Sequence, residues 1–159
     1  MREAFETLGL SPAWSLPAQT VRDAQRRMAA RWHPDRFADA AERDAAQQRV
    51  AKANEAAATL VDPLARGQAL LELFAPVPRP NDARPQPAFL MRMMSLREAI
   101  DGGDAGVQDE LEALRAQAEA DAERLFDRLV GGDSSAWPEA GEALGRLRAV
   151  RRAREALQQ

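Results

Sequence analysis

The sequence predicts an all-helical protein of two modules, without a β-sheet. Aromatic residues make up 5% of the 159 residues, tyrosine is absent and alanine is abundant, and this composition favours helices over sheets. Apolar residues recur at steps of three and four, which is the spacing of one helix face. Prolines crowd the stretch 74–87 too densely for a helix, so the chain is expected to divide there into two halves.

In the first half, a short helix over 2–8 is expected to end at Gly9, a residue that suits the left-handed position after a helix. A loop over 11–17 leads to a basic helix over about 18–32, which ends because Pro34 disfavours helical angles in the residue before it. The apolar face of this helix consists of Val21, Ala24, Met28 and Trp32.

A third helix is expected over about 41–60 and supplies the complementary apolar stripe of a helical hairpin. The stripe consists of Ala46, Val50, Ala53, Ala57, Leu60 and Val61. Asp62-Pro63 breaks this helix, and a further amphipathic stretch over 64–74 is expected to pack under the hairpin.

The second half holds three more predicted helices, over 88–101, 107–130 and 137–157. Glycine-containing turns separate them, and Ser134 or Ser135 is a candidate cap for the last helix, ahead of Pro138 in its first turn. Three helices with short connections suggest a small bundle.

Composition excludes several classes of function. The chain contains no cysteine and one histidine, so it offers neither thiol catalysis nor an obvious metal site, and we expect no cofactor and no bound iron. No stretch approaches the roughly 18 apolar residues that a membrane span needs, and the N-terminus lacks an apolar signal core. We therefore expect a cytosolic protein that does not bind membranes.

The most informative segment is 31–37, Arg-Trp-His-Pro-Asp-Arg-Phe, a rigid corner between two predicted antiparallel helices. Proline fixes one backbone angle, and His33 and Asp35 stand on the surface beside a positive track, which suits docking to an acidic partner. A catalytic dyad would need a nearby Ser or Cys in a recognisable arrangement, which the sequence lacks. The track consists of Arg22, Arg26, Arg27 and Arg31. Taken singly, a lone histidine such as His33 is more often a loop residue without a role, and a row of arginines is more often a solvated helix face, whereas the two together favour docking.

Other motifs accompany this corner. Phe-Glu-Thr-Leu-Gly-Leu at 5–10, the basic helix before the corner, and Ala-Asn-Glu-Ala at 53–56 followed by Leu60 resemble a J-domain. Pro-Leu-Ala-Arg at 63–66, Leu-Leu-Glu-Leu at 70–73 and Phe-Leu-Met-Arg-Met-Met-Ser-Leu-Arg-Glu at 89–98 resemble the HscB family of iron–sulfur co-chaperones. The resemblance spans nearly the whole chain.

This resemblance implies an all-α, L-shaped two-domain arrangement. An N-terminal J-domain helical hairpin over 1–75 and a Pro-rich linker over 76–86 precede a C-terminal three-helix scaffold-binding bundle over 87–159. In the family, the J-domain docks on a DnaK-type chaperone called HscA and stimulates its ATP hydrolysis, while the bundle binds the scaffold protein IscU.

The resemblance also implies roles for particular residues. His33, Pro34 and Asp35 would contact the chaperone with support from the four arginines, and Asp35 would pair with a basic group that is coupled to the ATPase trigger. The scaffold-facing patch would consist of Leu90, Met91, Met94 and Glu98, which share one helical side. Periodicity alone favours the bundle core for the three apolar residues of this patch, whereas the family match favours a contact surface.

The chain departs from the family pattern in several places. The family often has acidic residues at the positions of Ser95 and Gly102, and an aromatic residue near Ala149. The scaffold-binding surface is therefore expected to be weaker or differently arranged here. The cysteine-bearing N-terminal extension of eukaryotic members is missing, so we expect a bacterial, cytoplasmic form.

Other functions remain open from sequence alone. The same J-domain can serve a different client, or the basic helix can belong to a nucleic-acid-binding module. The net charge of −3 and the acidic residues of the second half argue against nucleic acid. No carboxylate pair belongs to a recognisable catalytic constellation, so we expect no enzyme, and the leucine and alanine faces fit a monomer or weak dimer.

Overall fold

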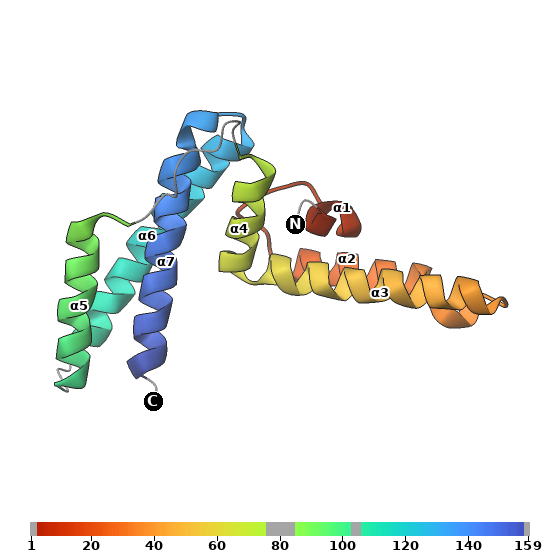
Figure 1. The fold of residues 1–159 in the computed structure, drawn as a ribbon, viewed down its shortest axis with the longest axis horizontal. Helices are drawn as coiled ribbons and strands as arrows, with labels where there is room; N and C mark the ends of the chain where they lie inside the picture. Colours follow the sequence, from red (N-terminus) through yellow and green to blue (C-terminus); the bar gives the residue numbers. More distant parts are fainter. Residues whose placement is uncertain (1–2, 76–84, 103–105, 158–159) are drawn as a thin grey trace. The chain divides into compact units, whose positions relative to one another are not determined.

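The computed structural model describes residues 3–75, 85–102 and 106–157. Every regular element in these ranges is a helix, which confirms the all-α prediction (Figure 1). The chain divides into two compact units, Met1–Leu73 and Phe74–Gln159. Most of the expected linker, 76–84, lies outside the described residues, and the L-shaped arrangement stays a prediction. None of the described helices combines the length and apolar character that a membrane-spanning segment needs.

The N-terminal unit is a helical hairpin with two shorter helices packed on it. Its elements are α1 (Glu3–Leu8), α2 (Ala18–Arg31), the 3₁₀ turn η1 (Pro34–Arg36), α3 (Ala40–Val61) and α4 (Pro63–Leu73). Helices α2 and α3 run antiparallel, α1 contacts both of them and α4 packs on α3 (Figure 1). Gly9 has a φ of +63° and ends α1, as expected.

The hairpin core is formed largely by the predicted apolar faces. Its fully buried side chains include Phe5, Val21, Ala24, Leu60 and Leu70. Val61 was expected on the buried stripe, but it is 40% exposed because α3 ends there and turns into α4. Met28 and Val50 are only half-buried.

Helix α3 begins with a capping interaction that the sequence prediction missed. The Asp39 carboxylate accepts hydrogen bonds from the N–H groups of Ala41 at 2.8 Å and Glu42 at 3.1 Å, two donors that have no partner within the helix. Helical structure consequently starts at Ala40. The cap fixes where the chain leaves the corner and enters the second helix of the hairpin.

We predict that Asp39→Ala lowers the free energy of unfolding by about 1 kcal/mol, since both N–H groups lose their acceptor. Asp39→Asn should cost much less, because asparagine caps helices about as well as aspartate. Urea unfolding followed by far-UV circular dichroism measures the difference. Equal stability of the Ala and Asn variants would contradict this account of the cap.

The C-terminal unit contains α5 (Pro87–Asp101), α6 (Val107–Val130), the 3₁₀ turn η2 (Ser134–Ala136) and α7 (Trp137–Leu157). Helices α6 and α7 form a long antiparallel pair, and α5 packs mainly on α7 (Figure 1). The bounds predicted for α6 and α7 agree with the structure. The largest fully buried side chains of this unit are Leu111, Phe126, Leu129, Leu144 and Val150.

The expected serine cap of α7 is wrong. Ser134 and Ser135 belong to the 3₁₀ turn η2, and α7 begins only at Trp137. Asp133 caps the turn instead, because its Oδ1 accepts hydrogen bonds from the backbone N–H and the hydroxyl of Ser135. The side-chain hydrogen bond from Ser135, and to a smaller extent the one from Arg128, hold the pKa of the Asp133 carboxyl below its ordinary value.

Candidate functional site

The His33-Pro34-Asp35 corner forms a defined turn at the end of the hairpin away from α1 and α4 (Figure 1). The N–H of Trp32 donates to the Met28 carbonyl at 3.0 Å and closes α2. His33 is then extended, with φ −64° and ψ 128°, as expected for a residue before proline. Two 3.0 Å hydrogen bonds, from Arg36 N–H to His33 O and from Phe37 N–H to Pro34 O, close the 3₁₀ turn.

The two polar side chains of the corner lie against each other and face solvent. The Asp35 N–H donates to His33 Nδ1 at 3.4 Å, and Asp35 Oδ2 lies 3.6 Å from the same nitrogen. The side chain of His33 is 59% exposed and that of Asp35 is 88% exposed. A carboxylate this exposed remains available to a partner, and the corner is suited to docking rather than to enclosing a substrate.

The four arginines of α2 are not equivalent. At 100° per residue, Arg22 and Arg26 lie in one row, and Arg27 and Arg31 lie in another, with Asp23 between the rows. Arg26 pairs with Asp23 at 3.4 Å, whereas Arg22 donates to Gln19 Oε1 at 3.1 Å. Arg31 lies over the Trp32 ring at 5.6 Å. The predicted track is therefore two exposed basic rows with an acidic residue between them.

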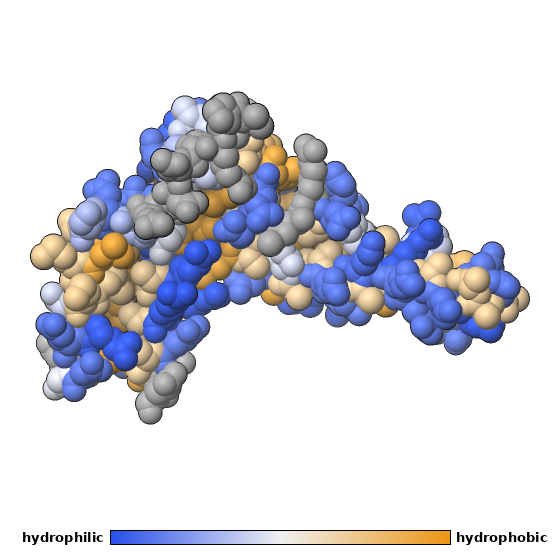
Figure 2. Space-filling model, viewed as in Figure 1, coloured by the Kyte–Doolittle hydropathy of each residue, from blue (hydrophilic) through white to orange (hydrophobic). Residues whose placement is uncertain are grey.

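Helix α5 presents the second cluster of predicted site residues. Leu90 is 45% exposed, Met91 69% and Met94 66%, while Glu98 is also exposed. The interpretation of the three apolar residues as bundle core is therefore wrong. Apolar surface is visible over α5 at the left of Figure 2. We call Leu90, Met91 and Met94 the apolar patch of α5.

The opposite side of α5 is held in the bundle, and this fixes the direction of the patch. Leu96 is buried, and Phe89, Met93 and Ile100 pack around the same cluster as Leu111 and Val150. Steps of three and four residues separate these α5 positions, so they form one face. The apolar patch lies on the remaining surface because the bundle has already covered the other face.

Two polar contacts that the sequence prediction missed also orient α5. Arg92 Nε donates to Glu110 Oε1 of α6 at 2.9 Å. Arg146 of α7 pairs with Glu142 at 2.6 Å, lies 3.6 Å from Asp121 of α6 and stands over the Phe89 ring at 6.0 Å. The contacts of Arg92 with Glu110 and of Arg146 with Asp121 and Phe89 join different helices, so no local sequence spacing signals them. The Arg146–Glu142 pair, by contrast, lies within α7.

A close contact between Pro85 and α7 fixes the start of α5. Pro85 packs on Gly145 of α7, where an added Cβ would lie 2.9 Å from the Pro85 Cγ. Only glycine leaves room for this contact.

Of the positions that depart from the family pattern, Ser95 and Gly102 are exposed and Ala149 is half-buried, so these substitutions leave the bundle core unchanged.

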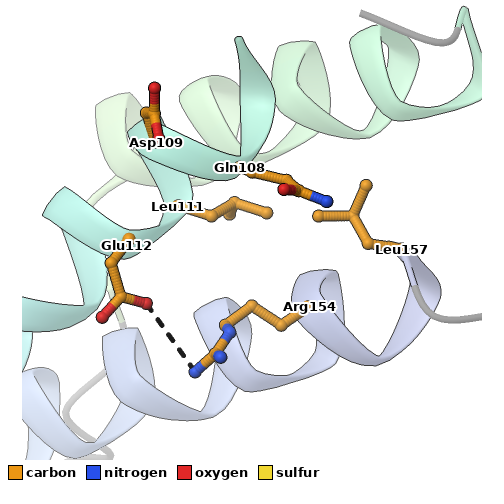
Figure 3. Close-up of a pocket in the computed structure, with 6 residues that line it drawn as sticks. All are labelled: Gln108, Asp109, Leu111, Glu112, Arg154 and Leu157. Carbon is orange, nitrogen blue, oxygen red and sulfur yellow. Dashed lines mark ion pairs between the residues drawn. The ribbon is translucent and has the colours of Figure 1, made fainter. Parts of the chain in front are cut away.

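A shallow pocket of about 380 Å³ opens between the start of α6 and the end of α7. Figure 3 shows its lining residues, Gln108, Asp109, Leu111, Glu112, Arg154 and Leu157. Glu112 lies 4.0 Å from Arg154, and a hydrogen bond from Arg115 holds the pKa of the Glu112 carboxyl below its ordinary value. The described residues contain no group of three or more His, Asp or Glu side chains placed to hold a metal ion. The pocket offers an ion pair rather than a catalytic group.

Comparisons with known proteins bear on both units. Residues 85–158 match the family model described as the HSCB C-terminal oligomerisation domain. The chain is 37% identical over 153 residues to a "Co-chaperone protein HscB homolog" of Paraburkholderia xenovorans (strain LB400), covering 93% of this chain and 87% of the relative. It is 30% identical over 158 residues to the homolog of Vibrio vulnificus (strain YJ016), covering 92% and 89%.

Solved structures show the same fold. Chaperone HscB from Vibrio cholerae matches with a TM-score of 0.68 and 29% identity, over 98% of this chain and 94% of that one. The crystal structure of human co-chaperone protein HscB matches with a TM-score of 0.79 and 20% identity, over 98% and 80%. The human protein therefore shares the fold, and the bacterial relatives share both fold and sequence.

Proposed function

Because this chain belongs to the HscB family of co-chaperones, we propose that it switches on the ATPase of a DnaK/HscA-type chaperone and delivers an IscU-like iron–sulfur scaffold to it. The observation that carries the proposal is the match to co-chaperone HscB over 93% of the chain, which includes both the corner and the apolar patch. The chain itself acts as an activator and carrier, with no catalytic step of its own.

In this proposal, residues 1–75 are the J-domain and dock on the chaperone through the His33-Pro34-Asp35 corner. The exposure of the Asp35 carboxylate supports pairing with a basic group of the chaperone. The arginines of α2, Arg22, Arg26, Arg27 and Arg31, extend this docking surface toward an acidic area of the partner. Exposed charges of this kind chiefly raise the association rate and orient the encounter.

Residues 87–159 are the scaffold-binding bundle in the same proposal, joined to the J-domain by the linker 76–86. Leu90, Met91 and Met94 contact the scaffold, and Glu98 lies at the edge of that contact. Exposed apolar side chains rimmed by polar residues are typical of protein-binding surfaces. Methionine suits such a surface because its unbranched side chain adapts to the shape of a partner.

A bridging experiment tests delivery. Immobilised scaffold protein should retain the DnaK-type chaperone in the presence of ATP when the full-length chain is added, and should retain little without it. Scaffold that retains this chain but no chaperone would contradict delivery. If the scaffold does not retain this chain while the chaperone does, the protein serves a different client.

A further inference from the structure

The aromatic residues on either side of the corner stack on each other. The rings of Trp32 and Phe37 have centroids 5.9 Å apart and planes inclined by 10°. This separation lies within the favourable range for stacked aromatic pairs. Trp32 directly precedes His33, and Phe37 directly follows Arg36. The stacked rings therefore hold together the two ends of the turn that carries His33, Pro34 and Asp35.

A cation from the next helix completes this stack. The guanidinium carbon of Arg49 in α3 lies 3.7 Å from the centroid of the Trp32 ring. Tryptophan is the most favourable aromatic partner for a cation, and 3.7 Å is well inside the distance at which the attraction acts. Arg49 is exposed and belongs to α3, so its contact joins the two arms of the hairpin.

Two further arginines hold the backbone on either side of the turn. Arg36 Nη1 donates to the Ala30 carbonyl at 3.2 Å, near the end of α2. Arg43 Nη1 donates to the Ala38 carbonyl at 2.8 Å, just before α3. The Ala30 carbonyl belongs to the last turn of α2, where a helix leaves carbonyls unpaired, and the Ala38 carbonyl belongs to the loop just before α3.

We propose that Trp32, Phe37 and Arg49 form a clamp that holds the His33-Pro34-Asp35 corner in the conformation that docks on the chaperone. These three are positioning residues, since they act through the corner rather than by contacting the chaperone. The functional part of this inference rests on the proposed function, whereas the clamp itself is a property of the isolated protein. If the corner is closed only part of the time, its apparent affinity for the partner is the affinity of the closed form multiplied by the fraction of molecules that are closed.

Amide hydrogen exchange of the full-length chain tests the clamp without any partner. The N–H groups of Arg36 and Phe37 close the turn, so Arg49→Gln should speed their exchange about 2–5-fold, as expected for loss of an exposed cation–π contact. Amides in the middle of α2 and α3 should exchange at unchanged rates. Arg49→Lys retains the cation and should restore most of the protection.

The functional readout is the ATP turnover of the DnaK-type chaperone, titrated with each variant. Arg49→Gln should raise the half-saturating concentration by up to about 2–5-fold, with the full factor when the open corner predominates, and should leave the maximal rate unchanged, because saturating partner selects the closed corner. Lys52→Gln is the matched control, since it removes an exposed cation one turn further along α3. It should change neither quantity.

Each outcome has a distinct meaning. Unchanged exchange of Arg36 and Phe37 in Arg49→Gln would overturn the clamp, whatever the ATP turnover. Exchange fast enough to show that the corner of the variant is mostly open, with an unchanged half-saturating concentration, would overturn its role in docking. If the unmodified protein fails to stimulate the chaperone, the proposed function fails, and the exchange rates alone decide whether the clamp exists.

Discussion

We expect Asp35→Asn to abolish the stimulation of the chaperone ATPase and to leave the fold of this protein intact. The substitution keeps the shape of the side chain and removes its negative charge. The side chain is 88% exposed, and the hydrogen bond that the residue makes to His33 comes from its backbone N–H. Exposed substitutions of this kind usually change stability by less than about 0.5 kcal/mol. Loss of stimulation therefore reports the missing charge at the docking surface.

Steady-state ATP turnover by the chaperone, with the variant in excess, measures this loss, and far-UV circular dichroism checks the fold. Asp44→Asn is a suitable control, because it removes an exposed carboxylate from the first turns of α3 while the corner stays unchanged. Full stimulation by Asp44→Asn together with basal turnover for Asp35→Asn is the expected pair of results. Stimulation by Asp35→Asn at the level of the unmodified protein would remove Asp35 from the mechanism.

The double substitution Met91→Asp and Met94→Asp should weaken scaffold binding by at least tenfold, about 1.4 kcal/mol or more. Both side chains are about two-thirds exposed, at 69% and 66%, so the bundle itself tolerates the change. In the complex, however, two carboxylates would be buried against the partner without cations to pair them, which is costly. Calorimetric titration with the scaffold protein measures the affinity.

Ser95→Asp provides the matched control for this substitution. It places one of the same carboxylates on an exposed position next to Met94, where the family pattern often has an acidic residue. Binding should therefore be retained or strengthened in this variant. Equal affinity of the double variant and the unmodified protein would show that the apolar patch lies outside the scaffold interface.

The helical framework was predictable because its signals are local. Glycine-rich turns and strong apolar periodicity gave the observed bounds of α6 and α7. The cap at Asp39 and the turn at Asp133 were missed or misassigned, since each depends on which of several neighbouring polar residues accepts the bond. Val61 followed the predicted stripe but lies at the end of α3, where packing rather than periodicity decides burial.

The candidate site was predictable in part for the same reason. The motif and proline at the corner predicted an exposed turn, which the structure contains. Periodicity could not tell which side of α5 faces the bundle, because apolar residues occur on both sides of this helix. Contacts between helices decide which side of α5 faces the bundle. Examples are the contact of Arg92 with Glu110 and that of Arg146 with Phe89. The role of Arg49 could not be predicted from sequence either, because its contact with Trp32 exists only once the hairpin has formed.

The two proposed docking surfaces have different chemistry, and this separates their expected effects in experiments. The corner offers an exposed carboxylate with arginines, so binding there should weaken as ionic strength rises. The apolar patch of α5 offers leucine and methionine side chains, whose burial depends little on screening by salt. Variants at one surface should therefore leave binding at the other unchanged.

The most direct test of the account is the steady-state ATP turnover of the DnaK-type chaperone with this protein, measured with and without the IscU-like scaffold. The His33→Gln variant is measured in parallel. We expect stimulation by the unmodified protein, a further synergistic increase when scaffold is present, and loss of both effects in His33→Gln. Turnover that stays basal with the unmodified protein, or that rises equally with His33→Gln, would contradict the account.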